Sequence, residues 1–331
     1  MQCAVVGAGA WGTALADLLA TNGCEVRLWA LERDVAAAVN TRHENPRFLP
    51  GAPLVPTIRA TNDLGDALAD ARLVVYAVPS AHLRTVARSG ARGVARNAIL
   101  AVATKGIEQE TLALMTDVIE AEVPDRPVVA VSGPSFAVEV AGRQPTAVVA
   151  ASRDIVAAQE VQETLSSATF RVYTHDDVIG VELCGSLKNV MAVATGIAEG
   201  VGLGFNSRAA LITRGLAEMT RLGVALGAQA GTFAGLAGIG DLVLTCTGAL
   251  SRNRAVGLAV GRGETLEQAL AGKETVAEGV ATARSARELA RREGVEMPIV
   301  ETVHRVLFEN YPPRHSVFAL MSRELRAERD A

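Results

Sequence analysis

Hydrophobic residues in the first half of the chain gather in short runs that alternate with segments of helical spacing. Between the first two runs, for example, Trp11, Ala14 and Leu18 recur at helical intervals as far as Asn22-Gly23, a typical helix end. Strands that alternate with helices predict an α/β fold with a mostly parallel, doubly wound sheet of the Rossmann type. We predict strands at Gln2–Val6, Glu25–Trp29, 73–78, 98–103, Val128–Ser132, 147–151 and 170–174.

The pattern changes after about residue 174, where the apolar positions recur only at helical spacing. Residues 187–198 are nearly apolar on every side, which indicates a helix buried inside a domain or against a partner subunit. A chain of 331 residues is long enough for two domains. We therefore predict a sheet domain at 1–177 and an all-helical C-terminal domain at 178–331, with helices at 178–198, 207–226, 251–260, 279–292 and 299–307.

Three glycines lie between the first predicted strand and the helix that follows it. Gly7, Gly9 and Gly12 form the pattern G-x-G-x-x-G, which is weak evidence alone but specific when it joins a strand to a helix in a βαβ unit. Backbone N–H groups at the start of that helix would face a pyrophosphate. Glu32 follows the second strand, where an acidic residue binds the adenosine ribose of NAD. We therefore predict that residues 1–177 bind a dinucleotide.

Composition and charge exclude several other classes of protein. The net charge of −4 argues against a nucleic-acid partner. The first predicted strand begins at residue 2 and no uninterrupted apolar run reaches membrane-spanning length, so we expect a cytoplasmic protein without membrane insertion. The cysteines lack metal-ligand spacing, and we predict no metal site and small buried side chains at Cys3, Cys24, Cys184 and Cys246.

Lysine is rare in this chain, which makes its few positions informative. Of the 32 basic residues only Lys105, Lys188 and Lys273 are lysine. Lys188 lies in an otherwise uncharged stretch, and burial would lower its pKa from about 10.4 toward a range useful for proton transfer. A lone lysine in such a stretch more often extends to the surface, but its place near the domain junction, the neighbouring amide of Asn189 and the rarity of lysine favour a buried group here.

A second polar group follows in the helical half. Asp241 and Thr245 are four residues apart and would share one face of a helix, although an aspartate there is also a common helix cap. Ser251 has the character of an N-cap, and Arg252 beside the exposed N–H groups would bind a phosphate. This half of the sequence therefore indicates a small phosphorylated substrate.

Taken together, the motifs resemble those of the NAD(P)-dependent glycerol-3-phosphate dehydrogenases of the bacterial biosynthetic type. The resemblance covers nearly the whole chain, in the order GAGAWGTALA, VPS, ATKGIE, VSGPSFAVEV, FRVYTHDDVIGVELCGSLKNV, NSRAALITRGLAEM, GIGDLVLTC, SRNR and VAEG. It implies reversible reduction of dihydroxyacetone phosphate to sn-glycerol 3-phosphate, which supplies glycerophospholipid synthesis, with NAD(H) or NADP(H) as the cofactor.

The resemblance also assigns expected roles to individual residues. Lys188 is implied as the proton donor and acceptor, with Asp241 and Lys105 as polar partners at the reacting end. Further implied substrate contacts are Gly133, Ser135, Asn189, Thr245, Ser251, Arg252 and Asn253. Besides the three glycines, the implied cofactor contacts are Ala10, Trp11, Glu32, Arg33, Lys105, Ala137, Arg252, Val276 and Glu278.

Two questions stay open at this stage. Glu32 would pair with the free 2′-hydroxyl of NAD and Arg33 with the 2′-phosphate of NADP, while Leu31 occupies a position where NADP users of the family often have arginine or histidine; we expect dual use. The rival functions are a two-domain dehydrogenase of a 3-hydroxy acid or sugar acid, and a catalytically silent dinucleotide sensor. The apolar helical domain also leads us to expect a homodimer.

Overall fold

The computed structural model describes residues 1–272, 277–322, 324–325 and 327–328, which fold into two compact units. The first unit comprises Met1–Lys105 and Ala113–Glu182. The second comprises Gly106–Leu112 and the described residues from Leu183 onward. The predicted division at 177/178 therefore differs from these units in two ways. The first turn of the long helix after residue 177 belongs with the sheet, and a short segment from within the sheet half belongs with the helices.

The first unit contains, within the described residues, an eight-stranded sheet in the order β10-β9-β8-β7-β6-β1-β2-β5. All neighbouring strands are parallel except the antiparallel pair β8 and β9. The sheet and its Rossmann-type order confirm the predicted fold class. The strands are β1 (Gln2–Val6), β2 (Glu25–Trp29), β5 (Arg59–Thr61), β6 (Leu73–Tyr76), β7 (Ile99–Val102), β8 (Val128–Ser132), β9 (Thr146–Ala151) and β10 (Phe170–His175).

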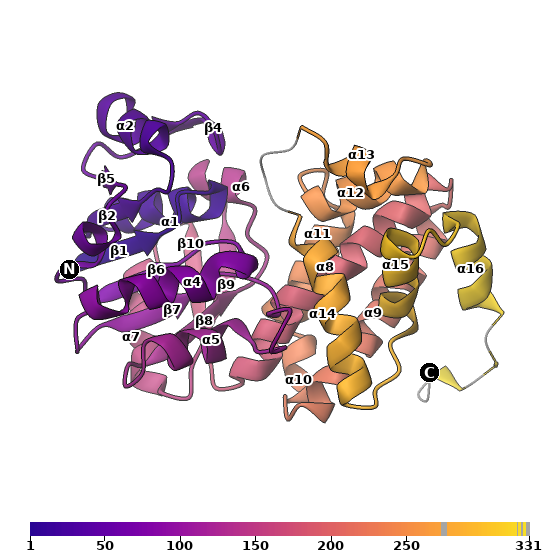
Figure 1. Ribbon diagram of the computed structural model, residues 1–331. Coiled ribbons are helices and arrows are strands. Elements are labelled where there is room, and N and C mark those ends of the chain that lie inside the picture. The colour runs from indigo at the N-terminus through magenta and orange to yellow at the C-terminus, as the bar shows by residue number, and fades with distance from the viewer. Residues whose placement is uncertain (273–276, 323, 326, 329–331) are drawn as a thin grey trace. The chain divides into compact units, whose positions relative to one another are not determined.

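Helices cover both faces of this sheet (Figure 1). Alternate strand residues point to opposite sides, so Val5 joins one hydrophobic cluster and its neighbour Val6 joins the other. One face packs against α1 (Ala10–Thr21), α2 (Arg33–Arg42), α6 (Ala137–Ala141) and α7 (Ile155–Leu165). The other packs against α3 (Leu64–Leu68), α4 (Ser80–Gly90), the 3₁₀ turn Ala91–Gly93 and α5 (Met115–Glu122). Because both faces are covered, the central strands β6, β7 and β8 are nearly continuous apolar runs.

A small two-stranded hairpin, β3 (Glu44–Asn45) and β4 (Leu49–Pro53), lies outside the main sheet. Its Asn45 is fully buried and donates from Nδ2 to the Ala8 carbonyl oxygen and to Thr13 Oγ1, each at 2.8 Å. The hairpin is thereby tied to the glycine turn. Sequence analysis missed it, because its strands carry no alternation of apolar and polar residues.

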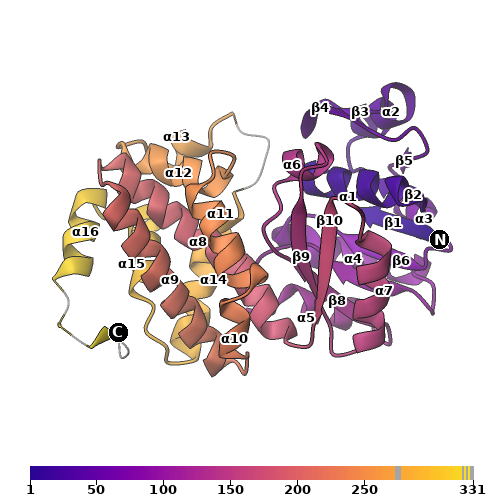
Figure 2. The same ribbon diagram turned by 180° about the vertical axis from the view of Figure 1, so that it is seen from behind.

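The second unit is helical in its described residues, as predicted (Figure 2). α8 (Val178–Gly200) runs through it, and nearly all of its side chains from Leu183 to Ala198 are buried. The other helices are α9 (Phe205–Ala225), α10 (Ala230–Phe233), the π-helical turn Leu236–Gly240, α11 (Asp241–Thr247), α12 (Arg252–Gly261), α13 (Leu266–Leu270), α14 (Glu278–Arg292), α15 (Pro298–Phe308) and α16 (Pro313–Met321).

Two helical segments have the length and mean hydropathy of a membrane-spanning helix, although charged residues interrupt both, in agreement with the expectation of no uninterrupted apolar run. Among the described residues, Val178–Gly200 and Ala230–Thr247 are each long and apolar enough, with a mean hydropathy of 1.3. Glu182, Lys188 and Glu199 interrupt the apolar run of α8, which the sequence predicted as a helix at 178–198. In α8, 89% of the most apolar window is buried within the protein, as in a core helix.

Candidate functional site

The turn from β1 to α1 requires glycine at two of its three motif positions. Gly7 has φ +115°, and a Cβ atom there would lie 2.9 Å from the backbone of Ala77. A Cβ on Gly12 would lie 1.8 Å from the Gly7 carbonyl oxygen, so no larger residue fits. A Cβ on Gly9 would meet nothing within 4 Å. Gly7 and Gly12 therefore serve the close packing of strand and helix, whereas Gly9 leaves open space beside the turn.

The start of α1 has the features of a dinucleotide phosphate site. Gly9 is the N-cap and supplies no side-chain acceptor, so the first N–H groups of the helix remain available to an anion. Ala10 and Trp11 form this first turn. Within the described part of the chain, the Trp11 Nε1 atom is buried and has no hydrogen-bond partner. These residues fit the predicted cofactor.

The loops after the next strands meet at the same edge of the sheet. Thr104 Oγ1 donates to the Val78 carbonyl oxygen at 2.7 Å, and Lys105 Nζ donates to the Gly133 carbonyl oxygen at 3.1 Å. Ser135 Oγ donates to that same carbonyl at 3.0 Å. The structure thus brings together Lys105, Gly133 and Ser135, as expected for the carboxyl ends of neighbouring strands. Ala137 follows at the start of α6.

The end of β2 presents the residues expected near the adenosine ribose. Glu32 is the N-cap residue of α2, yet its side chain forms no capping hydrogen bond. Leu31 is 71% exposed, and Arg33 is exposed at the start of the helix. Leu31 and Arg33, two of the residues expected to influence the choice between NAD and NADP, are therefore accessible, and Glu32 is half-buried.

In the second unit, Lys188 lies in a buried polar cluster. Its Nζ atom donates to Asp241 Oδ1 at 2.5 Å and to Thr245 Oγ1 at 3.0 Å. Asp241 is 0% exposed and Lys188 is 7% exposed. Thr245 Oγ1 also donates to the Asp241 carbonyl oxygen, one turn earlier. Lys188 is therefore a buried, paired ammonium group, as its sequence context favoured, and not a lysine that extends to the surface.

A sharp turn places Asp241 opposite the lysine. Gly238 interrupts the helical path before α11 with ψ −107°, and a Cβ atom on it would lie 2.0 Å from the Phe233 carbonyl oxygen. Asp241 is then the first residue of α11 and does not cap it, because Gly240 holds the N-cap position. Nearby, burial raises the pKa of Cys246 to about 12, so this thiol stays neutral beside the ion pair.

The start of α12 holds the residues expected to bind phosphate. Ser251 caps this helix by accepting from the Arg254 N–H at 3.2 Å, and Arg252 follows at its first position with an exposed side chain. Although Arg252 as a whole residue is exposed, the protein around its guanidinium partly desolvates it and lowers its pKa from the ordinary value, and the charge of Glu278 opposes that shift. Arg252 and Glu278, both expected at the cofactor, are thus electrostatic neighbours.

The expected substrate residues Asn189 and Asn253 contact each other. Asn253 Nδ2 donates to Asn189 Oδ1 at 2.9 Å, and Asn253 Oδ1 accepts from the Gly279 N–H at 2.9 Å. Both amides therefore bridge α8, α12 and α14. Two residues named from the sequence, Val276 and Lys273, lie outside the described residues.

Sequence analysis missed two polar groups that hold the site residues in place. Asn45 binds the glycine turn, and Glu199 accepts a bidentate pair of bonds from Arg254 at 2.7–3.1 Å. No local pattern identifies either group, because the partners lie 37 and 55 residues apart in the chain. Only the position of Arg254 within the SRNR motif could have drawn attention to it.

Comparison with known families matches both halves of the chain. Residues 2–158 match the family described as NAD-dependent glycerol-3-phosphate dehydrogenase N-terminus. Residues 177–318 match the corresponding C-terminus family.

Individual proteins and structures give the same result. The chain is 52% identical over 330 residues to the glycerol-3-phosphate dehydrogenase (NAD(P)+) of Geobacter sp. strain M21, covering 99% of this chain and 98% of that protein. It is 50% identical over 331 residues to the enzyme of that name from Myxococcus xanthus, covering 99% of each. The crystal structure of glycerol-3-phosphate dehydrogenase from Coxiella burnetii superposes with a TM-score of 0.94 at 42% identity, covering 97% of this chain and 99% of that one.

Proposed function

We propose that Lys188 transfers the proton in the reaction of this chain, which belongs to the NAD-dependent glycerol-3-phosphate dehydrogenase family. The protein is an NAD(P)-dependent oxidoreductase that interconverts dihydroxyacetone phosphate and sn-glycerol 3-phosphate. Bound NAD(P)H supplies the hydride that adds to the ketone carbon. The side chains must therefore bind the phosphate, orient the ketone and provide a proton to its oxygen.

The observation that carries this proposal is the buried ion pair of Lys188 with Asp241. An ammonium group held at a known position stabilises the negative charge that develops on the ketone oxygen, and it then donates a proton to that oxygen. Asp241 and Thr245 accept hydrogen bonds from Nζ, which fixes the position of the ammonium group. In the reverse direction the neutral amine accepts the proton of the substrate hydroxyl.

Arg252 is the proposed anchor for the substrate phosphate. Its guanidinium and the free N–H groups at the start of α12 suit a dianionic phosphate, because both the charge and the helix dipole favour it. Ser251 and Asn253 flank this position, and Asn189 contacts Asn253. We assign Lys105, Gly133 and Ser135 to the substrate as well, and Ala137 and Glu278 to the cofactor.

Initial rates test the reaction and the substrate together. NADH and NADPH oxidation are measured separately with dihydroxyacetone phosphate, and again with unphosphorylated dihydroxyacetone. We expect rapid oxidation that depends on the phosphate. If the protein binds both cofactors but consumes neither, it is a dinucleotide sensor. Oxidation that occurs instead with 3-oxo or sugar-derived acids would favour the carboxylate dehydrogenase.

Two substitutions test the role of Lys188. Lys188→Ala should reduce kcat by roughly 10²–10⁴-fold, the usual contribution of a general acid, while NAD(P)H binding persists. Lys188→Arg should fail to restore turnover, because arginine does not release its proton. A folded Lys188→Ala protein with near-normal turnover would exclude Lys188 as the proton donor.

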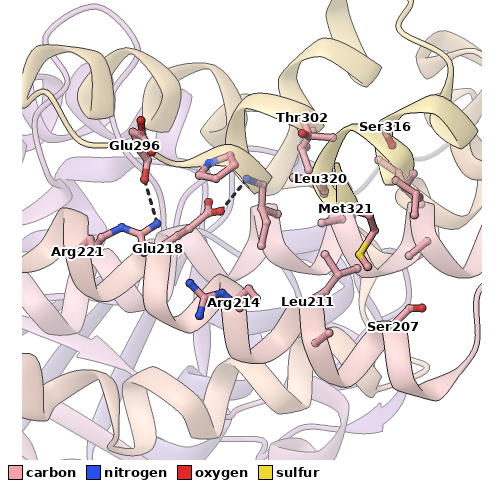
Figure 3. Close-up of a pocket in the computed structure, with 18 of the residues that line it drawn as sticks. Ser207, Leu211, Arg214, Glu218, Arg221, Glu296, Thr302, Ser316, Leu320 and Met321 are labelled. Atoms are coloured by element: carbon pink, nitrogen blue, oxygen red, sulfur yellow. Dashed lines mark hydrogen bonds between the residues drawn. The ribbon is translucent and has the colours of Figure 1, made fainter. Parts of the chain in front are cut away.

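We also propose that the protein is a homodimer joined through its helical unit. A groove of about 1160 Å³ lies between α9, α15 and α16 and is lined by apolar residues such as Leu211, Leu320 and Met321 (Figure 3). Phe205 and Phe318 are 81% and 72% exposed on the same helices. Exposed apolar surface of this kind suits a second copy of the chain related by twofold symmetry.

Sedimentation equilibrium tests the dimer. We expect a dimer for the native protein and a monomer for Phe318→Glu. A monomeric native protein would overturn the proposal.

We further place the enzyme in the cytoplasm, without membrane insertion because α8 is buried in the protein, and without a nucleic-acid partner because the net charge is −4.

A further inference from the structure

Four glycines bring the backbones of α8 and α12 into direct contact. Gly196 and Gly200 lie one turn apart on α8, and Gly257 and Gly261 lie one turn apart on α12. A Cβ atom on Gly196 would lie 2.1 Å from the Arg254 carbonyl oxygen, and one on Gly257 would lie 2.1 Å from the Val193 carbonyl oxygen.

The second glycine of each pair is equally confined. A Cβ atom on Gly200 would lie 2.5 Å from the Leu258 carbonyl oxygen, and one on Gly261 would lie 2.4 Å from the Ile197 carbonyl oxygen. Small residues spaced by four let two helices approach until their backbones touch. We call these four residues the glycine crossing.

An ion-pair cluster locks the same two helices at the glycine crossing. Glu199 of α8 accepts from Arg254 Nε at 3.1 Å and from its Nη2 at 2.7 and 2.9 Å. Arg208 of α9 donates to the same carboxylate at 2.8 Å. Arg254 lies two residues after Arg252 in the first turn of α12. The carboxylate therefore holds the turn that carries the proposed phosphate anchor.

The start of α14 is held against the same stretch of α8. A Cβ atom on Gly279 would lie 2.5 Å from the Asn189 carbonyl oxygen, directly after Lys188. Asn253 joins this contact by accepting from the Gly279 N–H and donating to Asn189. The starts of α12 and α14 thus both pack against α8, the helix that carries the proposed proton donor.

We propose that the glycine crossing and the Glu199–Arg254 ion pair are positioning elements that set the distance from Arg252 to Lys188. This inference rests on the function proposed above, in which those two residues bind the phosphate and protonate the ketone. Substrate contacts must be held to a fraction of an ångström for efficient catalysis, and a backbone-to-backbone crossing supplies that rigidity. Neither Glu199 nor the glycines touch substrate in this proposal.

The distinguishing readout is the preference for a phosphorylated substrate. We define it as kcat/KM for dihydroxyacetone phosphate divided by kcat/KM for dihydroxyacetone. A shift of Arg252 lowers only the first of these values, because dihydroxyacetone has no phosphate to bind. A merely structural defect lowers the amount of active enzyme and reduces both values by the same factor.

Glu199→Gln is the first variant, because it removes the charge with little change in volume. We expect the KM for dihydroxyacetone phosphate to rise about tenfold, with kcat/KM for dihydroxyacetone unchanged. Inorganic phosphate should inhibit the variant about tenfold more weakly than the native enzyme. Arg254→Lys keeps the charge but loses the bidentate geometry. Its KM for dihydroxyacetone phosphate should lie between that of the native enzyme and that of Glu199→Gln.

Gly257→Ala tests the crossing, with Gly231→Ala as the matched control. A methyl group on Gly231 meets nothing within 4 Å, so this variant should keep the native preference. Gly257→Ala should lower the preference at least tenfold, although alanine favours helix formation more than glycine does. If Gly257→Ala does not fold, Glu199→Gln decides the question alone.

The outcomes separate this inference from the function on which it rests. A native enzyme that reduces both ketones equally well would overturn the proposed phosphate anchor. A native enzyme with a strong preference, retained in Glu199→Gln, would overturn the positioning role and leave the proposed function intact.

Discussion

The ion pair between Lys188 and Asp241 makes a prediction about stability that is separate from catalysis. The side chains of the two residues are 9% and 1% exposed, and 2.5 Å separates Nζ from Oδ1. Lys188→Met keeps a long apolar side chain but leaves the Asp241 carboxylate buried without its cation. Removal of one partner of a buried pair typically costs about 3–5 kcal/mol, because the remaining charge is neither hydrated nor paired.

The size of the effect follows from this figure. For a domain of this size each kcal/mol changes the melting temperature by roughly 2–4 °C, so Lys188→Met should melt roughly 6–20 °C below the native protein. The double variant Lys188→Met/Asp241→Asn contains no buried charge at this position. It should recover most of the lost stability and remain inactive.

Thermal unfolding followed by circular dichroism measures the effect, without cofactor or substrate so that ligand binding does not contribute. NADH oxidation is measured on the same samples. The reasoning is refuted if Lys188→Met melts within about 2 °C of the native protein, or if the double variant is no more stable than Lys188→Met. Recovery of stability without recovery of activity would show that the pair is retained for chemistry.

Three further predictions concern other parts of the molecule. Burial raises the pKa of Glu182 from 4.5 to about 7, so the folded state keeps this proton where the unfolded chain has released it. Native stability relative to Glu182→Gln should therefore fall by about 3 kcal/mol as the pH rises from 4.5 through 7, and a pH-independent difference in urea unfolding would contradict this. Gly9→Ala should weaken NAD(P)H binding, measured by fluorescence titration, at an unchanged melting temperature, whereas Gly12→Ala should lower the melting temperature measured by calorimetry. Equal effects of the two variants on binding and on melting temperature would contradict this geometry. Leu31→Arg places a cation beside the expected adenosine ribose and should raise the ratio of kcat/KM for NADPH to that for NADH about tenfold, and an unchanged ratio would remove Leu31 from the cofactor site.

The local sequence predicted the strands that lie inside the sheet and the helix ends that carry a strong stop signal such as Asn-Gly. The strands Gln2–Val6, Glu25–Trp29 and Val128–Ser132 have the predicted bounds. The first and last are nearly continuous apolar runs, as expected of strands covered on both faces. The end of α1 at Asn22 and Gly23 was equally visible. The hairpin at Glu44–Asn45 and Leu49–Pro53 was not, since its short strands have no alternation of apolar and polar residues.

Sequence by itself determined which residues are chemically suited to the reaction. The glycine turn, the rare lysines and the SRNR motif all depend on residue type and short spacing, and these are present in the chain before it folds. The residues that belong together at the dinucleotide turn are likewise neighbours in sequence, so their relation required no knowledge of packing.

Only the tertiary structure decided which partners those residues have. Lys188 and Asp241 are 53 positions apart, and Asn189 and Asn253 are 64 apart, so no local pattern joins them. The close approach of α8 and α12 likewise depends on glycines that no sequence pattern distinguishes. Only the folded structure shows that a Cβ atom on Gly196 or Gly257 would lie 2.1 Å from the backbone of the opposing helix. Hydrophobic burial brings such distant segments together, and the polar contacts that form there reflect the whole packed core.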